Sequence, residues 1–270
     1  MGMVSRHEWG IDFHITDLGE RSMSSAIRIS AKNLGALALP NCCLRCFWLR
    51  LRMQHRLPFQ VFPGIFSTID VFTKRVVHAH FDQHGKPPDW LSDLGEISGY
   101  HEPPHYSKFN IVDEEYNILI TGTADGIFDR ADGTFLIIDY KTARFTDKQD
   151  ALLPLYEVQL NAYAMIGECC GFSPVSGLAL IYMEPMTDAA EHRRQGRPFG
   201  FEMGFRAHVL EVDVDPSLVR PLLARTREIW ESAVPPPGRP GCKDCRQVEE
   251  LVSVRCTEPR PHGNSGDLLE

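Results

Sequence analysis

The hydrophobic and polar positions along this 270-residue chain predict both strands and helices. Two mainly apolar runs, 117–128 and 134–141, flank the turn signal Ala131-Asp132-Gly133 and are typical of a β-hairpin. Gly133 suits the left-handed position of a three-residue loop. A continuous apolar run at 175–183 predicts a strand buried on both faces, and the alternating segment 205–214 predicts another.

Helical patterns surround these strands. Ser30 is a plausible N-cap for a helix that ends before Pro40, and Pro216 suits the first position of a late helix. Between them, residues 86–104 are rich in Pro, Gly and Asp and predict an irregular surface loop. The order of elements predicts an α/β fold with a mixed sheet. The predicted helices are 30–39, 42–55, 67–81, 154–170 and 216–230, and the predicted meander is 106–113, 118–128 and 135–141.

The hairpin register brings two acidic residues together. Pairing Arg130 with Thr134 places Asp125 opposite Asp139, with their Cβ atoms about 4.5–5.5 Å apart. Two carboxylates this close repel each other unless a proton or a metal cation lies between them. Lys141 projects from the same face of its strand as Asp139, because side chains alternate along a strand. This face therefore has the outline of a metal site.

The following helix supports the same site. Tyr156, Gln159 and Tyr163 stand at i, i+3 and i+7, which places them on one helical face. A crossover from strand to helix would lay that face near the two acidic residues.

The spacing of these residues resembles the PD-(D/E)XK nuclease superfamily, and specifically its RecB-like branch. The motifs are GxxD at 122–125, DxK at 139–141 and QxxxY at 159–163, with Ala124 in place of the proline of the family name. The resemblance implies a restriction-endonuclease-like mixed central sheet flanked by helices. It also implies hydrolysis of DNA phosphodiester bonds, with single strands or ends as the expected substrate.

The resemblance assigns a role to each residue. Asp125, Asp139 and the backbone carbonyl of Tyr140 are expected to hold Mg²⁺ or Mn²⁺. Lys141 is expected to orient the attacking water or to neutralise charge in the transition state. The substrate- and site-positioning pair of the family corresponds to Gln159 and Tyr163.

One metal ligand of the family has no direct counterpart. RecB-like enzymes usually carry a histidine four residues after a glycine on an earlier helix, and Thr68 stands at that distance from Gly64. Asp70 and His78 lie on the same predicted helix and are the substitutes, although helix capping and a structural histidine explain them equally well. More distant candidates are Glu102 and Glu114.

Two CxxC pairs lie almost two hundred residues apart, Cys43 with Cys46 and Cys242 with Cys245. In a cytosolic chain such pairs indicate a metal, either tetrahedral zinc or an iron–sulfur cluster. An alternative, that the N-terminal cysteines are core residues of an amphipathic helix, leaves the GCKDC segment of the polar tail unexplained.

The segment CLRCFWLR is also similar to the CPRxFWL segment of RecB-like nucleases, including those of CRISPR adaptation, that hold a [4Fe–4S] cluster. We therefore expect a [4Fe–4S] cluster that joins the two ends of the domain. These nucleases divide their ligands as one cysteine plus three, whereas this chain offers two plus two, so zinc is the alternative. Cys256 is a possible replacement for Cys46 as the fourth ligand.

Composition modifies this picture only in part. The formal charge of −8 disfavours nonspecific coating of duplex DNA. A local basic groove stays possible, because positive charge gathers in the N-terminal third, at Arg45, Arg50, Arg52, Arg56, Lys74 and Arg75. No apolar run reaches the ~18–20 residues of a membrane helix, and the first residues lack the apolar core of a signal peptide, so a cytoplasmic location without membrane contact is expected.

We therefore expect one nuclease-like domain at 29–258 between flexible ends at 1–28 and 259–270. The domain would comprise a helical part, a catalytic core and a cysteine-containing tail, at 29–104, 105–232 and 233–258. The first alternative is an inactive nuclease-fold scaffold or nucleic-acid-binding module with a structural iron–sulfur or zinc site. A more distant one is a metal-dependent hydrolase with another substrate.

Overall fold

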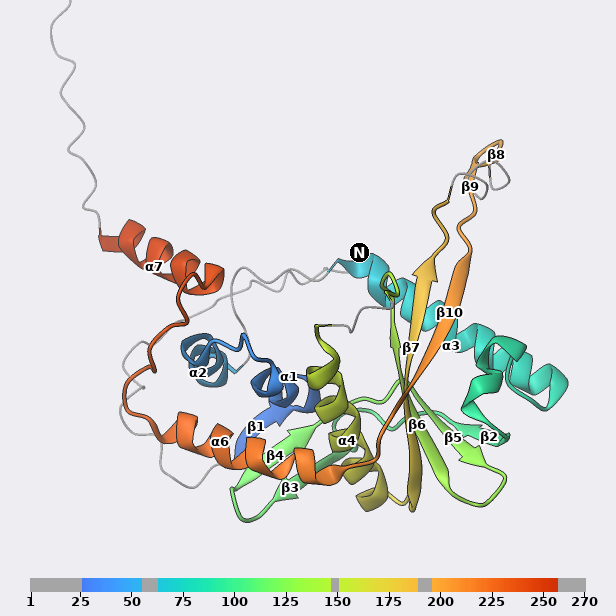
Figure 1. The fold of residues 1–270 in the computed structure, drawn as a ribbon, viewed down its shortest axis with the longest axis horizontal. Helices are drawn as coiled ribbons and strands as arrows, with labels where there is room; N and C mark the ends of the chain where they lie inside the picture. The colour runs from blue at the N-terminus through green and yellow to red at the C-terminus, as the bar shows by residue number, and fades with distance from the viewer. Residues whose placement is uncertain (1–25, 55–62, 147–150, 189–195, 257–270) are drawn as a thin grey trace, which may run out of the picture.

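Two β-sheets with a long helix between them form the body of the molecule (Figure 1). The computed structural model describes residues 26–54, 63–146, 151–188 and 196–256. The larger sheet has five strands in the order β10-β7-β6-β5-β2, parallel only between β6 and β7, and the smaller has the order β1-β4-β3. The strands are β1 (Ile27–Ser30), β2 (Ile97–His101), β3 (Asn110–Asp113), β4 (Ile118–Thr121), β5 (Gly126–Arg130), β6 (Phe135–Lys141), β7 (Val175–Pro185), β8 (Gly196–Arg197), β9 (Gly200–Phe201) and β10 (Phe205–Val212).

Helices cover both faces of the larger sheet, so the predicted α/β class with a mixed sheet flanked by helices is confirmed. Ser30 caps the first helix, as predicted, by accepting a hydrogen bond from the N–H of Asn33. None of the helices in the described ranges is long and apolar enough to cross a membrane. The helices are α1 (Ala31–Gly35), η2 (Ala36–Ala38), α2 (Leu44–Arg52), α3 (Gly64–His84), η3 (Asp89–Leu94), α4 (Leu153–Cys169), η4 (Pro216–Leu218), α6 (Arg220–Glu231) and α7 (Lys243–Cys256).

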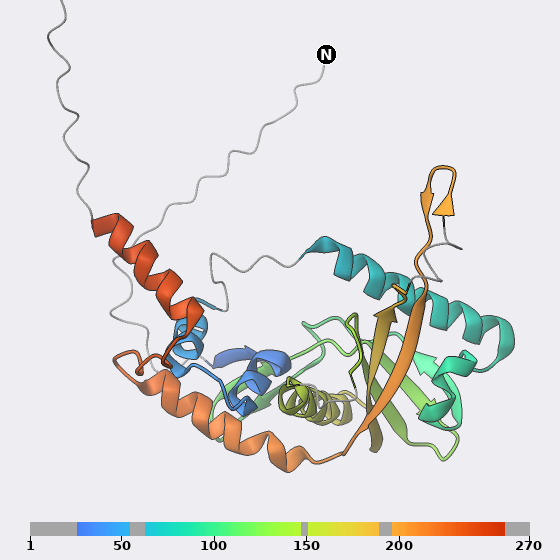
Figure 2. The same ribbon diagram turned by 45° about the horizontal axis from the view of Figure 1, so that its top comes forward.

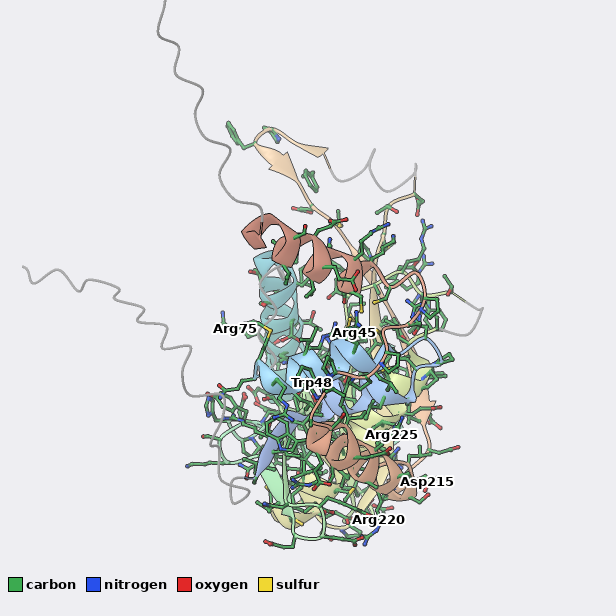
Figure 3. All side chains as sticks on the ribbon, turned by 90° about the vertical axis from the view of Figure 1, so that its left-hand side faces the viewer. Arg45, Trp48, Arg75, Asp215, Arg220 and Arg225 are labelled. Carbon is green, nitrogen blue, oxygen red and sulfur yellow. The ribbon has the colours of Figure 1, made fainter. Side chains whose placement is uncertain are left out.

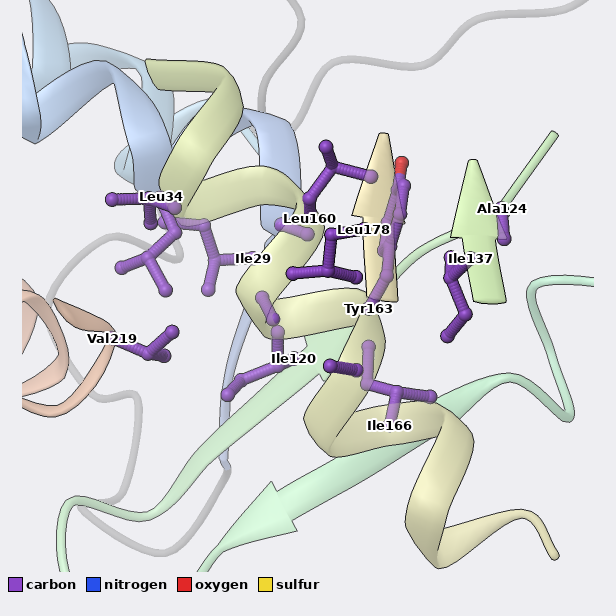
Figure 4. Packing of buried hydrophobic residues seen from close by; sticks show 14 of the residues in the cluster. Ile29, Leu34, Ile120, Ala124, Ile137, Leu160, Tyr163, Ile166, Leu178 and Val219 are labelled. Atoms are coloured by element: carbon purple, nitrogen blue, oxygen red, sulfur yellow. The ribbon is translucent and has the colours of Figure 1, made fainter. Parts of the chain in front are cut away.

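The core has two parts, one on each face of the larger sheet. Alternate residues of β6 separate them, since Ile137 packs toward α4 and Ile138 packs toward α3. Helix α4 is buried nearly all round, because it also contacts the smaller sheet and α1 (Figure 4). Tyr163 belongs to this α4 part of the core, whereas Tyr140 points to the α3 side, as alternation predicts. Asp139 and Lys141 therefore face α4.

The predicted hairpin register is confirmed. Arg130 and Thr134 pair, with the N–H of Arg130 donating to the carbonyl of Thr134 over 2.8 Å, and the ladder continues through Gly126 opposite Ile138. Gly133 adopts φ = +82° in the turn, the left-handed conformation that glycine tolerates best. The same register puts Asp125, just before β5, opposite Asp139.

Other strand predictions were wrong. The run 118–128 is not one strand of a three-stranded meander, because the segment between Thr121 and Gly126 carries the chain from the smaller sheet to the larger one. Strand β2 lies inside 86–104, where a loop was expected, and pairs with β5. Strand β1 begins at Ile27, inside the segment expected to be flexible, and pairs with β4. Both strands are short, and their own sequences do not indicate a strand. Their extended conformation depends on pairing with β4 and β5.

The C-terminal part returns to the N-terminal part. Figure 3 looks onto α2 and α6, with Arg45 and Trp48 on α2 and Arg225 on α6. The indole N–H of Trp48 donates to the carbonyl of Ser232 over 3.1 Å and joins α2 to the residue after α6. Helix α7 then packs beside α2, while β7 and β10 extend as a ribbon away from it on the opposite side of the molecule (Figure 2).

Candidate active site and cysteine centre

The two predicted carboxylates lie side by side at the start of β5 and the end of β6. Asp125 accepts a hydrogen bond at Oδ2 from the backbone N–H of Tyr140, over 2.8 Å. Asp139 is only 4% exposed and accepts at Oδ1 from Nε2 of Gln159, over 2.8 Å. Its other oxygen, Oδ2, forms an ion pair with the ammonium of Lys141. The structure therefore brings these predicted site residues together.

Helix α4 completes one wall of the site. Gln159 uses its amide group to donate both to Asp139 and to the hydroxyl of Tyr163, each over 2.8 Å. Its Oε1 accepts from Lys141 over 3.4 Å, and the ring of Tyr156 lies 4.1 Å below the same ammonium. Lys141 is thereby fixed by a carboxylate, an amide and an aromatic face.

The glycine of the GxxD motif has a packing reason. A Cβ atom on Gly122 would lie 2.4 Å from a ring carbon of Tyr163, well inside van der Waals contact. The chain thus passes directly over the tyrosine ring on its way to Asp125. Gly122 and Tyr163, which belong to separate motifs, form one packing unit.

Helix α3 forms the other wall of the site. Its two candidate metal ligands, Asp70 and His78, lie in different surroundings. The ammonium of Lys74 lies 2.8 Å from Oδ2 of Asp70 and 2.7 Å from Oδ1 of Asp125, so Asp70 belongs to the cluster. His78 instead pairs with Glu102 over 3.0 Å and stacks on a tyrosine of β2. Of the two proposed substitutes for the family histidine, Asp70 alone is linked to Asp125 in this way.

Burial and like charge make Asp125 hard to ionise. Burial, followed by the neighbouring carboxylate of Asp139, raises the pKa of Asp125 to about 7, and Lys74 opposes this shift. Burial works against the charge of Lys74, but the Asp125 carboxylate outweighs it and raises the pKa of Lys74 above its ordinary value. Lys32 of α1 lies within the electrostatic reach of the same cluster. Burial, followed by the charge of Lys141, lowers the pKa of Lys32, and the carboxylates of Asp139 and Asp125 oppose this shift.

The residues present fit a divalent metal ion. Oδ2 of Asp139 is buried and accepts no hydrogen bond from the described residues, although a cation faces it. The N–H of Tyr140 points at Asp125, and the carbonyl of a strand residue points to the same side as its N–H. Carboxylate and carbonyl oxygens are the ligands that Mg²⁺ and Mn²⁺ prefer.

Comparison with known proteins agrees with this geometry. The family model of the PD-(D/E)XK nuclease superfamily matches residues 73–247, more than half of the chain and the range that contains all three motifs. The chain belongs to the PD-(D/E)XK nuclease superfamily. The crystal structure of SSO0001 is also similar, at 15% identity over 77% of this chain and 78% of that one, but its TM-score of 0.36 supports no further argument. None of the curated proteins compared with the chain matches it.

A second centre in this nuclease-superfamily chain is formed by its two CxxC pairs. The sulfur atoms of Cys43, Cys46, Cys242 and Cys245 all lie within 4.8 Å of one another, so the four thiols can hold a metal ion. The Sγ atom of Cys245 lies 3.4 Å from those of both Cys43 and Cys46. The predicted join between the N- and C-terminal ends of the domain is therefore confirmed, while the side chain of Cys256 lies outside the described residues.

The local structure favours a thiolate at Cys43, whereas burial raises the pKa of Cys46 and Cys245. Cys43 occupies the N-cap position of α2 and Cys242 directly precedes α7, where the helix dipole stabilises negative charge. Burial opposes ionisation of Cys43, but the N–H of Arg239, 3.2 Å away, and the neighbouring thiols lower its pKa to about 6. Burial, followed by the hydrogen bond with Cys43, raises the pKa of Cys245 to about 11.

Most arginines expected to line a basic groove instead form contacts within the protein. Arg45 pairs with Glu249 over 2.7 Å and Arg50 pairs with Asp244 over 3.4 Å, which ties α2 to α7 beside the cysteines. Arg52 lies over the ring of Trp230 at 4.5 Å. The remaining arginines of the group are Arg75, which is exposed on α3, and Arg56, which lies outside the described residues.

Sequence reasoning missed the roles of Lys74 and Lys32 at the carboxylates. Lys74 was counted only as part of a basic region, and Lys32 was not singled out. The signal that could have found Lys74 is its position four residues after Asp70 on a predicted helix, the spacing of an intrahelical ion pair.

Proposed function

We propose that this chain is a Mg²⁺- or Mn²⁺-dependent nuclease that hydrolyses DNA phosphodiester bonds, with single strands or ends as substrate. The observation that carries the proposal is the hydrogen-bonded series Tyr163–Gln159–Asp139 beside Lys141 and Asp125. The buried amide of Gln159 donates once to the Asp139 carboxylate and once to the Tyr163 hydroxyl, which holds the amide in place. Burying polar groups costs free energy unless their hydrogen bonds are satisfied. Hydrogen bonds that fix the orientation of a buried carboxylate are typical of carboxylates that bind a metal ion.

Asp125, Asp139 and the Tyr140 carbonyl would hold the metal. When bound, such an ion polarises a phosphoryl oxygen and lowers the pKa of water. Gln159 keeps Asp139 in one rotamer through its 2.8 Å hydrogen bond, and Tyr163 keeps Gln159 in place through another. The ligand oxygens are therefore positioned before an ion arrives.

Lys141 would act on the substrate side. Its ammonium is held between Asp139, Oε1 of Gln159 and the face of Tyr156, so it points along one direction. A cation fixed beside the reacting phosphate stabilises the negative charge that develops in the transition state and orients the attacking water. Removing one such group typically costs about 10²–10³ in rate.

The substrate class follows from the superfamily and from charge. The chain carries a formal charge of −8, so its surface does not favour nonspecific binding along duplex DNA. A local contact with a single strand or an end needs fewer phosphates and suits this charge better. The RecB-like branch, which the motif spacing resembles, is part of the same proposal.

A cleavage assay tests the proposal. The protein is incubated with end-labelled single- and double-stranded DNA and Mn²⁺ or Mg²⁺, with EDTA as the metal-free control. Wild type is expected to cleave, Lys141→Ala to lose at least about 10²-fold in rate, and Lys86→Ala, a change in an exposed lysine paired with Asp89, to cleave like wild type. If wild type and Lys141→Ala are equally inert on every substrate and ion, the nuclease proposal fails and the inactive scaffold replaces it.

We further propose that the four cysteines bind their metal as a structural staple. Of the two predicted groups, the sulfur spacing favours zinc over a [4Fe–4S] cluster. One zinc ion with Zn–S bonds of about 2.3 Å sets tetrahedral S–S distances of about 3.8 Å. Cys245 lies 3.4 Å from Cys43 and from Cys46, Cys46 lies 3.6 Å from Cys242, and all four sulfur atoms lie within 4.8 Å of one another. A cubane places four iron atoms and four sulfides between the cysteines, which requires a wider spacing.

Metal analysis separates these possibilities. Protein purified without air is measured for zinc, iron and visible absorption. One zinc per chain supports the single-ion site, and a brown protein with iron and sulfide supports the cluster. Protein that contains neither metal, and takes up neither after refolding with them, contradicts the staple.

A further inference from the structure

The ammonium of Lys74 bridges two carboxylates beside the proposed metal ligands. It lies 2.8 Å from Asp70 and 2.7 Å from Asp125. Both distances are those of charge-assisted hydrogen bonds. The chain thus supplies its own counter-ion between α3 and the start of β5.

The two sides of the carboxylate cluster are unequal. On the side of Asp139, the ammonium of Lys141 forms an ion pair with this one carboxylate and donates a further hydrogen bond to the neutral Oε1 of Gln159. On the side of Asp70, one ammonium already bridges both carboxylates. A divalent ion at Asp139 therefore displaces an ammonium from one carboxylate, whereas an ion between Asp70 and Asp125 displaces an ammonium from two.

Charge balance leads to the same result. Three carboxylates, Asp70, Asp125 and Asp139, lie with Lys74 and Lys141 and within the electrostatic reach of Lys32, so the formal charges of the metal-free cluster cancel when all three carboxylates are ionised. One divalent ion adds two positive charges, which match one phosphodiester and one attacking hydroxide. A second divalent ion would exceed this and would compete with Lys74 for the same oxygens.

We propose that Lys74 takes the place of a second metal ion between Asp70 and Asp125, so that the active site holds a single divalent ion. Asp70 is then the anchor of Lys74 and not a metal ligand. The inference rests on the proposed metal-dependent function, because the ion is the one proposed there for Asp125 and Asp139.

Counting bound Mn²⁺ tests this without measuring activity. The full chain, with its cysteine centre loaded as purified, is titrated with Mn²⁺ alone and followed by the electron paramagnetic resonance of free Mn²⁺. Asp125→Asn gives the background, because Asp125 belongs to both positions. Wild type is expected to bind one ion above background and Lys74→Ala to bind two, or to bind the first at least tenfold more tightly.

Two variants serve as controls. Lys74→Arg keeps a cation between the carboxylates and is expected to bind one ion, and Lys86→Ala removes a lysine from the loop after α3 and is expected to match wild type. If Lys74→Ala does not fold, as judged by circular dichroism, Lys74→Gln replaces it, because glutamine keeps the stem and a donor but lacks the charge.

The outcomes distinguish the inference from the proposed function. Two ions in wild type, or one ion of unchanged affinity in the folded Lys74→Ala or Lys74→Gln variant, overturns the role of Lys74 and leaves metal-dependent hydrolysis standing. If neither wild type nor the Lys74 variants bind Mn²⁺ above background, the metal-dependent function itself fails and the inference fails with it.

Discussion

A single methyl group at Gly122 is expected to disturb the proposed active site through Tyr163. The added Cβ of Gly122→Ala would lie 2.4 Å and 2.8 Å from two carbons of the Tyr163 ring. The ring cannot move freely, because it is only 5% exposed and its hydroxyl accepts a hydrogen bond from Gln159. The strain must therefore displace the tyrosine or the chain segment that leads to Asp125.

The size of the effect follows from overpacking in a well-packed core. Extra methyl groups of this kind cost about 1–3 kcal/mol in the free energy of unfolding. At about 2–4 °C per kcal/mol for a domain of this size, Tm should fall by roughly 2–12 °C. Displacement of Tyr163 also moves Gln159 and hence Asp139, so cleavage is expected to fall by about 10²-fold, as for a misplacement of about 1 Å.

Urea titration and the cleavage assay measure the two effects. Gly64→Ala is the matched control, because a Cβ at Gly64 meets nothing within 4 Å, and its effect should stay within about 0.5 kcal/mol. In a Tyr163→Leu background, which lacks the ring edge, Gly122→Ala should cost much less than in wild type. An equal cost in both backgrounds, or a cost as small as that of Gly64→Ala, would refute the packing argument.

Other outcomes concern the buried amide, the metal ligand and the cysteines. Gln159→Leu should cost about 1–3 kcal/mol in urea titration, because Asp139 and the Tyr163 hydroxyl lose their shared donor; stability equal to wild type would contradict this. The pKa of Asp125 is raised to about 7, so below pH 7 a proton competes with the metal for this carboxylate. Mn²⁺ affinity should therefore fall about tenfold per pH unit below pH 7. Equal Mn²⁺ affinities at pH 6 and pH 7 would disprove this expectation. Cys242→Ser should lower the metal content of the cysteine centre and speed proteolysis of α7, and unchanged values of both would rule out the staple.

The sequence predicted the hairpin and its acidic pair because both depend on local rules. The loop Ala131-Asp132-Gly133 fixes the register, and the register alone places Asp125 opposite Asp139. The i, i+3 and i+7 positions of α4 then bring Gln159 to Asp139. These steps need only the alternation of side chains along a strand and the residue spacing of a helix. Both can be worked out from a short stretch of sequence.

The same rules failed where pairing is not local. The apolar run 118–128 has the pattern of one strand, yet its first part pairs with β1 and β3 and its last part with β2 and β6. The change of sheet falls between Thr121 and Gly126, where Gly122 passes over Tyr163. Since the ring that forces this passage lies about forty positions further on, the local pattern could not predict the break.

The face of α3 that points at the active site was hidden for a different reason. Asp70 and His78 are eight residues apart, so they lie about 12 Å apart along the helix and cannot both serve one ion. Choosing between them requires knowing which face of α3 is buried. The pattern of large apolar residues along this helix does not predict that face correctly. Phe72 is 67% exposed, while the buried residues of the helix are Thr73 and Val77. The face next to these carries Lys74 to Asp125, so Val77, the half-buried Phe81 and an ion pair orient α3. The periodicity of large apolar residues does not reveal this ion pair.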